Sequence, residues 1–131
     1  MHDSEYDRLI NNKWLSAGLM DSGRILPSDK QAMAGCRALY RKATGRPFKG
    51  KVKIVRRKNQ YTWLRNGILV VNPNRPDDWD RTGWPDMVHL MSHLCHHILR
   101  PSERPHSRAQ LELEKNLTNY ALSPVFEKYI Y

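Results

Sequence analysis

Five of the six histidines of this chain lie between His89 and His106. His89 and His93 are four residues apart, so on a helix their side chains lie on the same face, one turn from each other. Two imidazoles in this arrangement can bind a single metal ion, and imidazole suits Zn²⁺ and other first-row metals. The spacing therefore predicts a metal site, and we expect zinc as its cofactor.

A helix is predicted over residues 85–99, since Pro85 suits the first helical position and Pro101 ends the segment. On a helical wheel, an apolar stripe is displaced from the histidines by roughly a third of a turn. One stripe should face the core and the other should line a cleft. The apolar stripe comprises Met87, Leu90, Met91, Leu94 and Ile98.

One helix cannot complete a tetrahedral metal site, so a further ligand must come from elsewhere. His106 and Glu114 are the candidates, and both belong to or precede a final helix predicted over 107–121. Two histidines and either group would leave a fourth position for water. The alternative is a polar cluster in which His, Glu and Ser side chains satisfy one another without a metal.

The length of 131 residues indicates one domain, predicted to span residues 1–131. The two cysteines form no metal-binding or redox motif, which favours free thiols in a reducing compartment. The N-terminus is polar and no segment is apolar enough to span a membrane. We therefore expect a cytoplasmic protein without a membrane partner.

The net charge of +9 comes largely from a basic region between residues 37 and 65. Such a region attracts polyanions, and aromatic residues nearby can stack on bases. This predicts a nucleic-acid partner, or a protein associated with nucleic acid. The alternatives are a solvated basic face and a surface for an acidic protein. The predicted contacts are Lys49, Lys51, Lys53, Arg56, Arg57 and Lys58.

The remaining elements follow from periodicity and turn signals. Helices are predicted over 5–19 and from Ser28 or Asp29 to just before Gly45. Residues 51–72 alternate as strands do, with turns at 58–60 and at Asn66-Gly67. The simplest arrangement is a three-stranded antiparallel meander. The predicted fold class is therefore α+β, with helices packed on that sheet.

The stretch from Trp84 to Glu114 resembles the core of SprT-like metallopeptidases, a minimal form of the zincin fold. The resemblance rests on Val88-His89-Leu90-Met91-Ser92-His93, on Pro105-His106-Ser107 and on Leu113-Glu114, after an apolar strand that ends at Asn72-Pro73. It is closer still to small zincin-like proteins of bacteriophages. It covers about residues 37–120 and leaves the N-terminal helix (5–20) outside. It implies a zincin-like fold in which the histidine-bearing helix and the C-terminal helix form the site. It also implies a phage-encoded protein in the host cytoplasm, with a host or virion protein as a further partner.

The chain departs from that family at Leu90, where an active zincin has a glutamate as general base. Leucine cannot transfer a proton. Another base would have to be recruited, with Glu112 first, or else Glu114, His96 or His97. We therefore expect a pseudo-peptidase or a repurposed metal-binding protein. The alternatives are an active metallohydrolase with a relocated base and a basic nucleic-acid-binding module with structural histidines.

Overall fold

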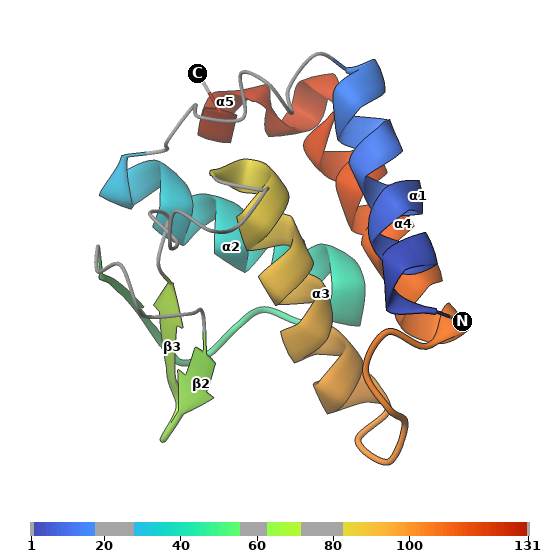
Figure 1. Ribbon diagram of the computed structural model, residues 1–131. Coiled ribbons are helices and arrows are strands. Elements are labelled where there is room, and N and C mark those ends of the chain that lie inside the picture. Colours follow the sequence, from blue (N-terminus) through green and yellow to red (C-terminus); the bar gives the residue numbers. More distant parts are fainter. Residues whose placement is uncertain (1, 18–27, 56–62, 72–82, 131) are drawn as a thin grey trace.

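The computed structural model describes residues 2–17, 28–55, 63–71 and 83–130 of the chain (Figure 1). Most of the described residues are helical, and one small sheet lies beside the helices. The elements in chain order are α1 (Asp3–Ser16), α2 (Asp29–Thr44), β1 (Lys51–Ile54), β2 (Trp63–Arg65), β3 (Ile68–Val71), α3 (Trp84–Leu99), α4 (Arg108–Ala121), the 3₁₀ turn η1 (Pro124–Phe126) and α5 (Glu127–Ile130).

Helix α2 has the two ends that the sequence predicted. The Ser28 side chain accepts a hydrogen bond from the Gln31 backbone, and the Gln31 side chain accepts one from the Ser28 backbone, which forms a capping box. Gly45 ends the helix with φ of 73°, in the left-handed region that glycine adopts without strain. These local signals fix the position of α2 before any tertiary contact is considered.

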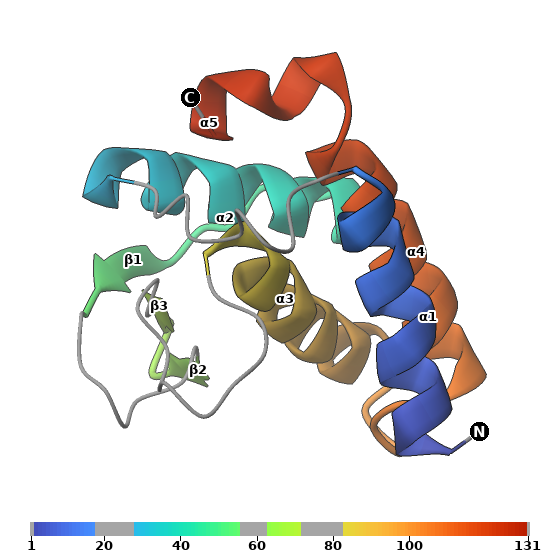
Figure 2. The same cartoon turned by 45° about the horizontal axis from the view of Figure 1, so that its top comes forward.

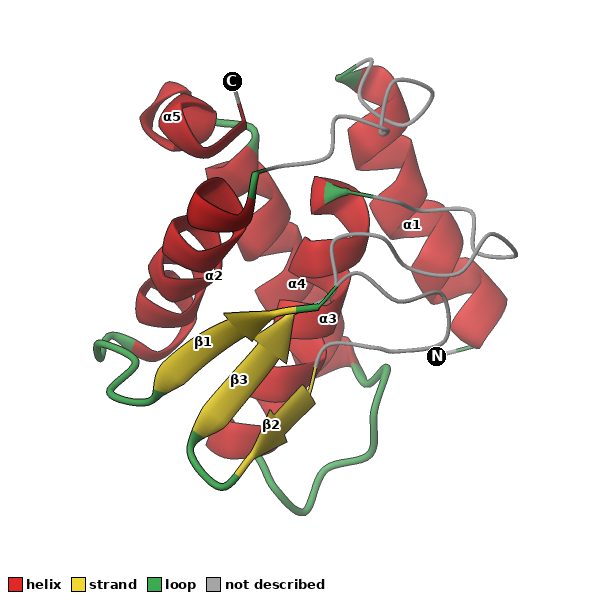
Figure 3. Cartoon of the chain, turned by 90° about the vertical axis from the view of Figure 1, so that its left-hand side faces the viewer, coloured by secondary structure: helices red, strands yellow, loops and turns green. Residues whose placement is uncertain are grey.

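The prediction of a three-stranded antiparallel meander is wrong. The sheet has the order β1-β3-β2, and β1 runs parallel to β3 while β2 is antiparallel to it (Figure 3). The Asn66-Gly67 turn does join β2 to β3, and both residues have positive φ as a tight hairpin requires. The most apolar strand, β3, takes the central position because it buries Leu69, Val70 and Val71. Strand β1, with exposed lysines, lies at one edge of the sheet, and β2 lies at the other. The predicted turn at 58–60 lies outside the described residues.

The expectation that the helices pack mainly on the sheet is also wrong, because the core is built chiefly between helices. Helix α3 lies between α2 and α4 and packs against both, and α1 packs on α4 (Figure 2). Gly35 of α2 lets α3 approach closely, since a Cβ atom there would meet the Trp84 ring at 2.1 Å. The largest fully buried side chains include Trp14, Tyr6, Phe126 and Ile10. The N-terminal helix, which the resemblance leaves out, therefore belongs to the core.

No helix among the described residues is long and apolar enough to cross a membrane. Helix α3 is the most apolar of the helices, and it ends at Leu99 as predicted, before Pro101. It buries Trp84, Met87, Val88, Met91 and Cys95, whereas Leu90, Leu94 and Ile98 are only half-buried. The predicted apolar stripe is thus correct in part and is shifted around the helix towards α2.

Candidate metal centre

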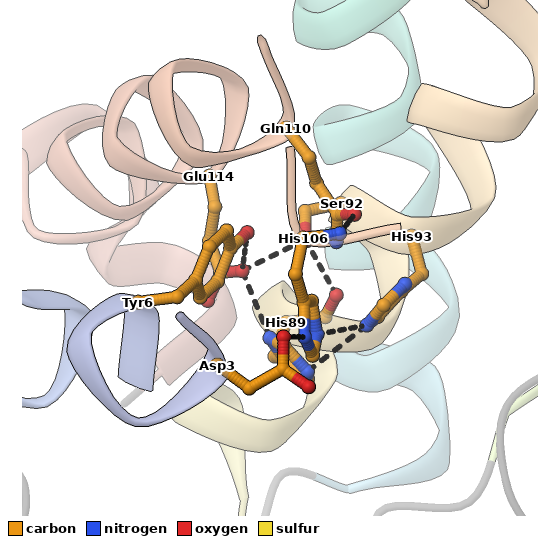
Figure 4. A network of polar contacts seen from close by, with 8 residues as sticks. All are labelled: Asp3, Tyr6, His89, Ser92, His93, His106, Gln110 and Glu114. Carbon is orange, nitrogen blue, oxygen red and sulfur yellow. Dashed lines mark hydrogen bonds and ion pairs between the residues drawn. The ribbon is translucent and has the colours of Figure 1, made fainter. Parts of the chain in front are cut away.

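Three imidazoles converge between α3 and the start of α4 (Figure 4). The Nε2 atom of His93 lies 3.1 Å from Nε2 of His89 and 3.0 Å from Nε2 of His106. All three residues offer a ligand atom within 4.8 Å of the others, which is close enough to hold one metal ion. The predicted convergence of His89, His93 and His106 is confirmed.

The distances suit a small metal ion. At metal–nitrogen bonds of about 2.0–2.1 Å, tetrahedral ligand nitrogens lie roughly 3.3 Å apart. The two nitrogen–nitrogen distances here are slightly shorter, so a small outward rotation of the rings would accommodate an ion. His89 is buried, and His93 and His106 are half-buried, so the centre is partly accessible to solvent.

His106 is held in its place by an unusual backbone. Its φ of 58° lies in the left-handed region, which residues other than glycine seldom adopt. The Gln110 side chain compensates by accepting a hydrogen bond of 2.7 Å from the His106 backbone N–H. Such strained positions concentrate at functional sites. The strain directs the His106 ring towards α3 rather than towards solvent.

Two carboxylates set the hydrogen positions on the rings. Nδ1 of His89 lies 2.8 Å from Oε1 of Glu114, and Nδ1 of His106 lies 3.2 Å from Oδ1 of Asp3. A carboxylate accepts a hydrogen bond, so we assign the proton of each neutral ring to Nδ1. The Nε2 atom of both rings then carries a lone pair directed at His93. Histidines that bind metals are oriented by carboxylates in this way.

Glu114 is the carboxylate of the site that is fully buried, with a side chain that is 0% exposed. Besides His89, its Oε1 accepts hydrogen bonds from Tyr6 Oη at 2.7 Å and from Ser92 Oγ at 2.9 Å. Glu114 is therefore placed to orient His89 rather than to bind the metal directly. Tyr6 also stacks on the His106 ring, with 4.6 Å between ring centroids.

The electrostatic environment keeps His93 neutral. Burial, together with the neighbouring His89 and His106, lowers the pKa of His93 to about 3. A neutral imidazole has the lone pair that a metal needs. At neutral pH the ring is therefore ready to bind a cation without first losing a proton.

A second polar cluster lies one turn further along α3. Nε2 of His96 contacts Oε1 of Glu103 at 3.0 Å and Oγ of Ser107 at 3.2 Å, and Ser107 also donates to Glu103. The hydrogen bonds from Ser107 and then from His96 lower the pKa of Glu103. Ser107 caps α4 through the Gln110 backbone N–H. This cluster fixes the loop that carries His106.

The structure does not bring the other predicted residues to the centre. Glu112 is 61% exposed and pairs with Lys115, and a separation of two residues turns its side chain away from that of Glu114. Leu90 is half-buried. Lys49, Lys51 and Lys53 are exposed on or beside β1. The remaining predicted nucleic-acid contacts, Arg56, Arg57 and Lys58, lie outside the described residues.

Sequence reasoning missed Asp3 and Tyr6, which α1 contributes to the site. Tyr6 was expected only as an apolar position of its helix, and it does pack there as well. The partners of these two residues are more than one hundred positions away in the sequence. No local pattern marks such a contact. An acidic residue and a tyrosine one turn apart at the start of a helix are the only signal that exists.

No protein-family model, curated protein or solved structure matches this chain.

Proposed function

We propose that this protein binds a divalent transition metal, with Zn²⁺ as the first candidate, through Nε2 of His89, His93 and His106. The observation that carries the proposal is the convergence of these three nitrogens. The carboxylates of Glu114 and Asp3 hold the protons of His89 and His106 on Nδ1, which leaves their Nε2 atoms with lone pairs. Without a cation, the single N–H of His93 can donate a hydrogen bond to only one of the two Nε2 atoms that face it, those of His89 and His106. A metal ion accepts all three lone pairs and leaves a fourth position for water.

The charges near the centre support the same proposal. A divalent ion bound to three neutral imidazoles would carry two positive charges. Glu114 and Asp3 supply two negative charges, one on each side of the ligand set. A buried carboxylate is costly unless it is paired and hydrogen-bonded, and a nearby cation reduces that cost.

We further propose that the protein is a pseudo-peptidase that acts as a metal-dependent binding protein. Leu90 follows His89 at the position where the SprT-like metallopeptidases that the chain resembles have a glutamate as general base. Glu114 Oε1 is engaged by three donors, and Glu112 points away from the centre. His96 is held by Glu103 and Ser107. Three of the four candidate bases are therefore engaged or directed away from the centre, and the fourth, His97, is exposed on α3.

The metal proposal is tested by elemental analysis of protein purified without a nickel column. We expect about one zinc ion per chain, or uptake of one ion when Zn²⁺ is added after chelation. His93→Ala should abolish this binding, while His97→Ala, which removes an exposed histidine from the same helix, should not. If the native protein neither retains nor takes up a metal, the histidines form a polar cluster and the proposal is wrong.

The peptidase proposal is tested with zinc-loaded protein and an unstructured protein substrate. We expect no cleavage above background from the native chain, because a general base contributes on the order of 10²–10⁴ in rate. Leu90→Glu supplies the missing base, and Leu90→Gln is a control of the same shape that cannot act as one. Cleavage by the glutamate variant alone would identify a dormant peptidase. Silence from all forms would support a binding role, and strong cleavage by the native protein would contradict the proposal.

The exposed lysines support a second candidate function, weak binding of nucleic acid. Lys51 and Lys53 alternate with buried Val52, so both lie on the solvent side of the edge strand β1. Binding should weaken steeply with salt and should fall further when Lys51 and Lys53 are replaced by alanine. Lysines also protect edge strands from unwanted pairing. Affinity that is unchanged in the double variant would leave them with that role alone.

A further inference from the structure

A cavity of about 660 Å³ lies beside α2. Its walls come from α2, the loop that leads to β1, and the C-terminal part of the chain in α4 and α5, elements that Figure 3 shows around α2. The volume lies within the range of about 300–1,000 Å³ that is typical of small-molecule sites. The lining residues are Ala34, Arg37, Ala38, Arg41, Lys42, Pro47, Phe48, Tyr120 and Tyr129.

One face of α2 brings cations to this cavity. Arg37 and Arg41 are one helical turn apart, and Lys42 adjoins them. Arg41 and Lys42 lie in the last turn of α2, where the helix dipole favours cations, and Arg37 adds a third positive charge one turn earlier. No carboxylate is among the lining residues, and neither Arg41 nor Lys42 has a carboxylate partner within the described part of the chain. The arrangement leaves positive charge available to an anion.

Two of the three cations, Arg37 and Lys42, contact the walls of the cavity. The Arg37 guanidinium donates to the carbonyl oxygens of Phe48 at 2.9 Å and Gly50 at 3.1 Å, and lies over the Phe48 ring. The Lys42 ammonium lies 5.6 Å from the centre of the Tyr120 ring. These contacts preorganise the site, which reduces the entropy that a ligand must overcome.

Alanine and aromatic side chains line the cavity beside the cations. Ala34 and Ala38 are one turn apart on α2, and their small side chains leave room above the helix. Phe48 and Tyr129 line the space from the loop and from α5. Arg37 lies over the Phe48 ring and Lys128 lies over the Tyr129 ring, so a planar ligand would use the ring surface that these cations leave. Stacking on an aromatic ring tolerates any base.

We propose that this cavity binds a free nucleoside monophosphate, with the base against Phe48 and Tyr129 and the phosphate at Arg41 and Lys42. A phosphate monoester carries about −1.5 to −2 charge at neutral pH. It therefore neutralises a group of cations more fully than a single carboxylate would. Arginine also binds phosphate oxygens in pairs. The site lies apart from the histidine centre in its lining residues, so the proposal stands independently of the metal.

The test is calorimetric titration of the full-length protein with AMP, adenosine and inorganic phosphate. We expect saturable binding of AMP, with adenosine and phosphate each at least about tenfold weaker, because each occupies only half of the site. The same titration with the His93→Ala variant should give the same affinity for AMP. Loss of AMP binding in that variant would place the anion at the histidine centre and overturn the proposal.

Variants of the cavity sharpen the result. Arg41→Ala and Lys42→Ala should each weaken AMP binding about tenfold, the effect expected for a lost charge-assisted hydrogen bond. Arg46→Ala is the matched control, since it removes an exposed cation near the cavity without removing a lining residue, and it should change the affinity by about twofold or less. Ala38→Leu should fill the slot and prevent binding. Its thermal unfolding is compared with that of the native chain, and if it fails to fold, the Arg41 variant decides.

Two further kinds of result would overturn the proposal. One is an absence of saturable AMP binding at millimolar concentration, or binding that Arg41→Ala and Lys42→Ala leave unchanged. The other is binding of a ten-nucleotide single strand without binding of AMP. That second result would assign the cations and rings to a nucleic-acid strand instead of a free nucleotide.

Discussion

The candidate metal centre and the second polar cluster, around His96, use similar residues and differ in which imidazole nitrogen the acidic partner contacts. In the first cluster the carboxylates contact the Nδ1 atoms of His89 and His106, so the Nε2 atoms face one another. In the second, Glu103 and Ser107 both contact Nε2 of His96. The first arrangement directs lone pairs into a common space, whereas the second satisfies the nitrogen that could have bound a metal.

The number of histidines therefore does not define a metal site. His93 and His96 are three residues apart on one helix, yet only His93 has an Nε2 atom that faces other imidazoles. The position of each carboxylate decides whether a ring is a ligand or a structural hydrogen-bonding group.

The largest effect is expected when a ligand is removed from the first cluster. His93→Ala should lower the Zn²⁺ affinity by more than about a hundredfold, beyond the effect typical of an orienting residue. His96→Ala should destabilise the fold, because it removes a buried ring and its hydrogen bonds to half-buried Glu103 and Ser107, but it should leave the zinc stoichiometry unchanged. Competition with a chromogenic chelator measures the affinities, and urea unfolding measures stability. Equal losses of zinc in the two variants would abolish the distinction between the clusters.

The next effect concerns Glu114, which orients His89. Glu114→Gln keeps the shape and one acceptor oxygen but removes the negative charge. We expect the Zn²⁺ affinity to fall by about ten- to a hundredfold, the range for partners that orient metal ligands. Glu112→Gln is the matched control, with the same chemical change two residues away on an exposed position. A loss in Glu114→Gln as large as that in His93→Ala would indicate that Glu114 binds the metal directly.

How much of this could be read from the sequence depends on the range of each contact. Ser28, Gly45 and Asn66-Gly67 act over three or four residues, and the ends of α2 and the β2–β3 hairpin were predicted from them. The strand order was not predictable in the same way. Whether β1 pairs with β2 or β3 depends on how much apolar surface each strand buries in the folded core, and Ile68–Val71 took the centre.

In the candidate site, too, the local contacts were predictable from the sequence and the long-range contacts were not. The spacing of His89 and His93 is a local property of one helix, and His106 follows within thirteen residues of His93. The contribution of α1 was not predicted, because Asp3 and Tyr6 meet the centre only after α1 has packed on α4. Leu90 was recognised as a departure from the sequence alone, since its chemistry does not depend on the fold.

A smaller effect is expected from Tyr6, which links α1 to Glu114. Tyr6→Phe keeps the ring that stacks on His106 and removes only the hydroxyl donor. A hydrogen bond to a charged acceptor contributes about 1.5–3 kcal/mol, so the free energy of unfolding of the metal-free protein should fall by about that amount. Tyr120→Phe, a change of the same kind on a half-buried ring, should alter it by about 0.5 kcal/mol or less. An unchanged stability in Tyr6→Phe would show that water replaces the hydroxyl at Glu114.

The smallest effect is expected at Asp3, the second carboxylate of the first cluster. Its side chain is 76% exposed, so solvent screens its attraction for His106. Asp3→Asn should weaken Zn²⁺ binding about two- to fivefold, as expected for an exposed pair of up to about 1 kcal/mol, and the effect should shrink at high salt. Glu5→Gln is the matched control because Glu5 lies in the same first turn of α1 and interacts with the same helix dipole. An equal loss in both variants would mean that the charge of the helix terminus acts on the site. A loss in Asp3→Asn alone would mean that orientation of His106 by Asp3 does so, which extends the metal centre to the third residue of the chain.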